Sequence, residues 1–100
     1  MVIVIVEHFL STKGQNYFPR WLSDTATILK NSEGFVSIDF IEKVGACGTC
    51  LLLKFDSLEN LRTWSGSEEH SQALDRLSQY QVKKQISQIY KIGKWRIAGT

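Results

Sequence analysis

The chain has 100 residues, of which 43% are hydrophobic and 22% charged, and its formal net charge is +2 at pH 7. This composition is typical of a single globular domain over residues 1–100 and excludes a disordered polypeptide. So mild a charge, with Lys and Arg scattered along the chain, does not indicate nucleic-acid binding. The apolar run Met1–Val6 is far shorter than the ~20 residues of a membrane span, and no basic leader precedes it. We therefore expect a cytoplasmic protein without a membrane partner.

The first two elements follow from the spacing of apolar residues. Val2–Phe9 is predicted to be a strand with apolar residues on both faces. After a short loop, apolar residues at intervals of three and four predict a helix over 16–31, with Asn16 as its N-cap. Pro19 fits such a helix if it lies in the first turn, where a backbone N–H is not needed. Gly34 is expected to end the helix.

The remainder of the chain predicts a hairpin, a broken helix and a last strand. Apolar strands are expected at Phe35–Val44 and Thr49–Phe55, joined by a short Gly-containing turn. The segment 56–80 is predicted to be helical in two pieces, followed by a strand at Val82–Ile92. Residues 94–100 are expected to form a tail.

The order βαββαβ predicts an α+β fold of the ferredoxin-like type, an antiparallel sheet with two helices on one face. The other face of the sheet would then be bare. Because strands Val2–Phe9 and Thr49–Phe55 are apolar on both faces, a second copy of the chain is expected to cover it. The sequence thus predicts a homodimer in which the two sheets face each other.

Segment 55–70 contains two signals for the start of a helix. Asp56 with Glu59 is interpreted as one capping pair, and Ser67 before two glutamates as a second helix start. Trp64 and one of the two histidines, His70, lie at the junction between the pieces. These two residues either pack in the core or line a pocket.

The cysteines Cys47 and Cys50 match the pattern C-x-x-C, which occurs in redox and zinc sites. A redox pair of this kind needs its first Cys at a helix N-terminus, whereas this pair is expected in a turn before a strand. A zinc site would need two more ligands at suitable spacing. We expect neither catalysis nor metal binding from these residues.

A family resemblance rests on the segment that begins at Phe55. A ferredoxin-like chain with this spacing resembles the antibiotic biosynthesis monooxygenase family of dimeric α/β barrels, and the matching residues are Phe55, Ser57, Leu61, Trp64, Ser67 and His70. Oxygenases of the family use molecular oxygen without a metal or flavin cofactor. The resemblance therefore implies a dimeric α/β barrel, no bound cofactor, and oxygen as co-substrate.

The resemblance also implies site residues. The family's oxygenases carry an Asn, a Trp four residues later and a Tyr six beyond it; Asn60 and Trp64 match, and His70 replaces the Tyr. A basic residue expected on the last strand has Lys83, Lys84 or Lys91 as candidates. The haem-degrading branch fits less well, because its His ten residues after the Trp is replaced by a Leu.

The sequence leaves two functions open for this protein. The first is a monooxygenase for a small aromatic or quinol-like substrate, and the alternative is a non-catalytic, small-ligand-binding or stress-associated dimer. The expected pocket lies between helices and sheet. Its catalytic candidates are Asn60, Trp64 and His70, with His70 as general base; its substrate-binding candidates are Trp21, His8 and Tyr17. Packing in the core is the alternative role for Trp21 and Tyr17, and a simple exit of the strand to the surface is the alternative for His8.

Overall fold

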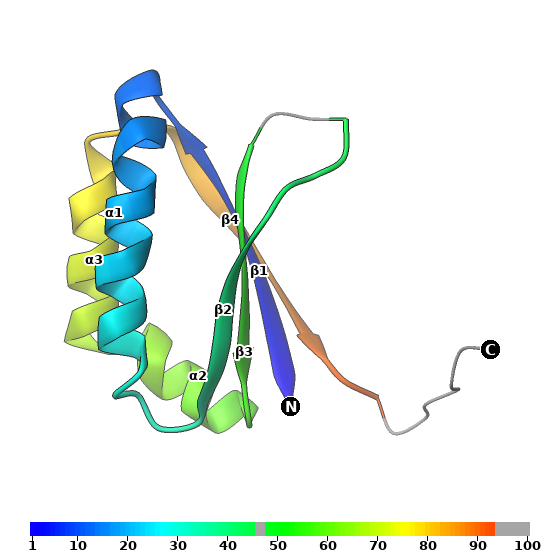
Figure 1. Cartoon of the computed structure of the whole chain (residues 1–100). Helices are drawn as coiled ribbons and strands as arrows, with labels where there is room; N and C mark the ends of the chain where they lie inside the picture. The colour runs from blue at the N-terminus through cyan, green and yellow to red at the C-terminus, as the bar shows by residue number, and fades with distance from the viewer. Residues whose placement is uncertain (46–47, 94–100) are drawn as a thin grey trace.

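The protein is a two-layer α/β structure in which all helices cover one face of a sheet (Figure 1). The computed structural model describes residues 1–45 and 48–93. The sheet has the strand order β2-β3-β1-β4, with every neighbouring pair antiparallel. The elements along the chain are β1 (Val2–Leu10), α1 (Thr12–Leu29), β2 (Phe35–Ile41), β3 (Thr49–Phe55), α2 (Leu58–Ser65), α3 (Glu68–Ser78) and β4 (Gln81–Lys91). The predicted ferredoxin-like arrangement, with a second helical segment in two pieces, is confirmed.

The core lies between the helices and the sheet. Buried and less buried residues alternate along β1 and β3, and the pairing of the two strands brings the buried residues together on the helix side. Val4 pairs with Leu53, and both are buried on the helix side. Their neighbours Ile5 and Leu52 pair on the other face and are only half-buried. Side chains on one face of a strand recur every second residue, so each strand presents one apolar row to the helices and another to the open face.

Helix α1 begins earlier than the sequence predicted. Its N-cap is Ser11, whose hydroxyl accepts a hydrogen bond from the Gly14 N–H at 3.2 Å, so the prediction of Asn16 as N-cap is wrong. Pro19 consequently lies inside the helix, where it leaves the carbonyl of Gln15 without its helical partner. Both residues are exposed, so water can solvate that carbonyl. The misplaced start came from treating Pro19 as a first-turn residue.

Two other boundaries differ from the prediction. Helix α1 ends at Leu29, and Gly34, with φ of +78°, lies in the loop that leads into β2 rather than at the helix end. Strand β2 ends at Ile41, the last residue that pairs with β3, three residues before its predicted end. The predicted tail, 94–100, lies outside the described residues. Among the helices that the structure describes, none is long and apolar enough to cross a membrane.

Candidate functional site

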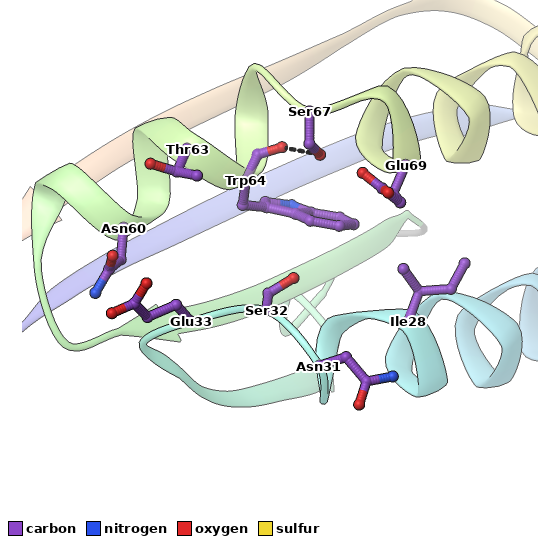
Figure 2. A pocket seen from close by; sticks show the side chains of 9 residues that line it. All are labelled: Ile28, Asn31, Ser32, Glu33, Asn60, Thr63, Trp64, Ser67 and Glu69. Atoms are coloured by element: carbon purple, nitrogen blue, oxygen red, sulfur yellow. Dashed lines mark hydrogen bonds between the residues drawn. The ribbon is translucent and has the colours of Figure 1, made fainter.

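A cavity of about 390 Å³ lies where the C-terminal end of α1 faces the junction of α2 and α3. Figure 2 shows the indole of Trp64 extending across its middle. Trp64 is 6% exposed, so nearly all of its ring is packed. The cavity is lined by Ile28, Asn31, Ser32, Glu33, Asn60, Thr63, Trp64, Ser67 and Glu69.

Serine caps fix the geometry of the helix junction. Helix α2 is capped by Ser57, which accepts from the Asn60 N–H at 3.1 Å, and not by Asp56 as predicted. Helix α3 is capped by Ser67, as predicted: its hydroxyl accepts from the His70 N–H at 3.1 Å. The same hydroxyl is 2.6 Å from the Trp64 carbonyl, to which it donates. Through these two hydrogen bonds Ser67 fixes the position of the Trp64 backbone relative to the first turn of α3.

The side chain of Asn60 is held at the wall of the cavity by its neighbours. One N–H of its amide donates to Asp56 Oδ1 at 2.8 Å. Gly34 lies directly against both side chains, and a Cβ at that position would collide with them. The second amide N–H and the amide oxygen are the groups that Asn60 could offer to a ligand.

His70 packs beside the cavity rather than in its lining. Its ring meets the Trp64 ring edge-on, with centroids 5.5 Å apart and planes at 77°. Partial burial lowers the pKa of His70, and a backbone interaction with Ser65 acts in the opposite direction. A His with a lowered pKa is neutral at pH 7 and can accept a proton.

The charged groups at this cavity are acidic. Glu33 and Glu69 contribute carboxylates, and none of its described lining residues is basic. Two carboxylates around an apolar ring disfavour an anionic ligand and favour a neutral or cationic one. The predicted basic candidates Lys83, Lys84 and Lys91 all belong to β4, which contributes no described residue to the lining.

The structure places Trp21 and His8 in a different cluster, at the middle of α1 and near the end of β1. The Trp21 Nε1–H donates to the carbonyl of Ala73 at 2.8 Å, which ties α1 to α3. The imidazole of His8 lies 5.7 Å, centroid to centroid, from the rings of both Trp21 and Phe18. Tyr17 lies in a third place, 5.2 Å from the ring of Tyr80.

The six predicted site residues therefore do not line one cavity. Asn60, Trp64 and His70 are together at the helix junction, and their roles stay predictions. Sequence reasoning missed the contribution of the loop after α1, from which Asn31, Ser32 and Glu33 line the cavity. The polar run between the end of a helix and a glycine was the available signal for this loop.

The cysteine and metal predictions concern another part of the molecule. Cys50 lies on β3, is buried, and has a raised pKa because of its burial and, to a lesser extent, the charge of Glu7. Cys47 lies outside the described residues. Within residues 1–45 and 48–93, no three His, Cys, Asp or Glu side chains are grouped so that they could hold a metal ion.

Comparison with solved structures shows which proteins share this fold. A candidate antibiotic biosynthesis monooxygenase from Deinococcus radiodurans superposes with a TM-score of 0.82 and 22% identity, covering 99% of this chain and 100% of that one. A similar candidate from Nitrosomonas europaea gives 0.79 at 12% identity, covering 95% and 100%. A mutant form of SnoaB, a cofactor-independent oxygenase from Streptomyces nogalater, gives 0.78 at 9% identity, covering 98% and 97%.

No family model matches the sequence, and no curated protein matches it. At these identities the structural likeness establishes the fold. The chain has the ferredoxin-like fold of antibiotic biosynthesis monooxygenase structures over nearly its whole length, as the sequence resemblance implied.

Proposed function

We propose that this protein is a cofactor-independent monooxygenase that oxygenates a small aromatic or quinol-like substrate in the cavity beside Trp64. The observation that carries the proposal is the grouping of Asn60, Trp64 and His70 at one helix junction. It is supported by the shared fold of SnoaB, which is a cofactor-independent oxygenase.

In the proposed reaction, the indole of Trp64 provides a flat apolar surface for a planar substrate. Asn60 donates its free amide N–H to a substrate oxygen. Neutral His70, which packs against Trp64 beside the cavity, takes the acidic proton from the substrate through one bridging water. For a methylene between two aromatic rings the overall change is CH₂ + O₂ → C=O + H₂O. Four electrons pass from the substrate to oxygen, one oxygen atom enters the product, and the other leaves as water.

The acidic lining of the cavity limits the charge that a substrate can carry when it enters. Glu33 and Glu69 would repel a substrate that is already an anion, so the substrate enters neutral and loses its proton only inside the cavity. Substrates with a carboxylate or sulfonate next to the reacting ring are expected to be poor.

Binding without turnover is the second candidate function, and one observation favours it. His70 is not among the residues that line the cavity, and one of the two N–H groups of the Asn60 amide already donates to Asp56. A non-catalytic module that binds a small apolar ligand would need Trp64 but neither of the other two residues.

Oxygen consumption against a panel of reduced quinones and anthrones, with and without added metal and flavin, separates the two functions. The oxygenase consumes oxygen above the autoxidation rate without either addition. Trp64→Phe should then raise KM while leaving the fold intact. Binding of a panel member with no enzyme-dependent oxygen uptake would favour the binding module.

The assembly we propose is a homodimer that buries the helix-free face of the sheet. On this face Ile86 is 44% and Tyr90 is 50% exposed, next to half-buried Ile3, Ile5 and Leu52. The face also bears Glu7 and Lys54, the partners of Cys50 and Ile3 in the sheet. Gln88 and Asp39 lie on it too, paired with Ile5 and Leu52, so the apolar side chains are interspersed with polar ones. Exposed apolar side chains gathered on one face, with polar groups around them, are typical of a protein interface.

Sedimentation equilibrium tests the assembly. The wild type should be a dimer at micromolar concentration, and Leu52→Glu should shift it to monomer or aggregate. Gln72→Glu, on the exposed side of α3, is the matched control and should stay dimeric. A monomeric wild type would contradict the proposed dimer and leave the proposed reaction to be tested separately.

A further inference from the structure

The indole N–H of Trp64 is a polar group that the proposed reaction does not use. Trp64 is 6% exposed, and its only hydrogen bond to another lining residue joins its carbonyl to Ser67 (Figure 2). The indole N–H of Trp21, by contrast, donates to the carbonyl of Ala73. Most buried polar groups in native proteins are paired, so a donor without a partner among the described residues needs an explanation such as a ligand.

This N–H is accessible from the cavity. It does not belong to the unpaired side-chain atoms that are fully enclosed by the described residues, which are His8 Nδ1 and Thr25 Oγ1. The indole that carries it extends across the middle of the cavity (Figure 2). A ligand there can accept a hydrogen bond from Trp64 Nε1, and a second from the amide N–H of Asn60 that does not bind Asp56. Two donors at one wall favour a ligand with an oxygen acceptor on its ring.

The charges around these donors are negative. Glu33 comes from the loop after α1 and Glu69 from the first turn of α3, and Figure 2 shows them on opposite sides of the indole. Lys30 and Arg62, the basic residues nearest to lining positions in the sequence, do not line the cavity. A cationic group in the cavity would therefore meet carboxylates and no lining cation.

The helix ends do not change this sign. Helix α1 directs its C-terminal end, with a partial negative charge, toward the cavity, and α3 directs its N-terminal end, with a partial positive charge. These two contributions oppose each other. The carboxylates of Glu33 and Glu69 then decide the preference, and since both residues are exposed, the preference should be modest and sensitive to salt.

From this arrangement we propose that the substrate of this cavity is an aromatic compound with a ring oxygen and an ammonium group on a side chain. The ring oxygen accepts from Trp64 Nε1 and Asn60, and the ammonium group pairs with Glu33 or Glu69. The ring itself enters uncharged, as in the proposed reaction. Naming this compound a substrate rests on the proposed function, whereas its binding can be measured without any reaction.

Isothermal titration calorimetry with three phenols of similar shape tests the proposal. Tyramine carries an ammonium group, tyrosol carries a hydroxyl in its place, and 3-(4-hydroxyphenyl)propanoate carries a carboxylate. At low ionic strength tyramine should bind about 5-fold more tightly than tyrosol, and the propanoate about 5-fold more weakly, which is the effect expected of two exposed carboxylates. High salt should bring both ratios close to one.

Variants locate the preference in this cavity. The double variant Glu33→Gln, Glu69→Gln should bring the ratio of tyramine to tyrosol affinity close to one. Glu42→Gln is the matched control, because it removes one negative charge beyond the opposite end of β2, and it should keep the ratio. Trp64→Phe removes the indole N–H and should weaken tyramine and tyrosol alike, by about 5-fold.

Equal affinities for tyramine and tyrosol, a ratio kept in the double variant or lost in Glu42→Gln, or no binding of tyramine would each overturn the proposal. If the double variant does not fold, the salt dependence of the wild-type ratio decides. The titrations are run without oxygen, so they do not depend on turnover. Oxygen uptake with an anthrone but equal affinities for the phenols would remove the ammonium preference alone, and the preference without any oxygen uptake would remove the oxygenase alone.

Discussion

His8 should make the stability of this protein depend steeply on pH below neutrality. Burial lowers its pKa from 6.5 to about 4. The unfolded chain takes up a proton at this imidazole below pH 6.5, whereas the folded protein does not until about pH 4. Stability is therefore full above pH 6.5 and is lost as the pH falls toward 4. The total loss is about 3 kcal/mol, of which about 2 kcal/mol is lost between pH 8 and pH 5.

Urea denaturation of the wild type and His8→Phe at pH 8, 7, 6, 5 and 4 measures this effect. Carboxylates titrate in both proteins and cancel in the difference, so the wild type should lose about 2 kcal/mol more than the variant by pH 5. His70→Gln is the matched control: the lowered pKa of His70 acts in the same direction, but the variant should keep the His8 slope. The same pH dependence in the wild type and His8→Phe would refute a buried, neutral imidazole.

Three further predictions concern the site and the cysteines. His70→Ala should reduce turnover by roughly 10²-fold if His70 is the base, and unchanged steady-state kinetics would remove that role. Gly34→Ala should destabilise the protein by about 2 kcal/mol, because φ is +78° and the new methyl would collide with Asn60. Thermal unfolding of the variant should show a Tm below that of the wild type, and an unchanged Tm would contradict the prediction. The double variant Cys47→Ser, Cys50→Ser should keep full activity while folded, and loss of oxygen uptake would show that the thiols take part.

The sheet and its layers could be predicted because their signals are local. Apolar alternation in β1 and β3 identifies two strands, and periodicity identifies the helices that cover them. The start of α1 could not be decided in the same way. Ser11 and Asn16 are both good N-caps, and only the packing of the whole helix selects the first.

The site could be predicted only as far as helix geometry reaches. Asn60 and Trp64 are four residues apart on α2, and the Ser67 cap sets the first turn of α3, so their grouping with His70 follows from sequence spacing. Which part of α1 faces them depends on tertiary packing. Ile28 and Trp21 are seven residues apart, which places them on the same face of α1 but about 10 Å apart along the helix. Only Ile28 lines the cavity.

Incorporation of isotopically labelled dioxygen tests the central claim most directly. The protein, freed of metal by a chelator and of flavin by dialysis, is incubated with ¹⁸O₂ and an anthrone, and the product is analysed by mass spectrometry. The proposed monooxygenase places one labelled oxygen in each product molecule, at a rate that exceeds autoxidation and falls in His70→Ala. Product without the label, or label that enters only after metal or flavin is restored, would contradict a cofactor-independent reaction in the cavity beside Trp64.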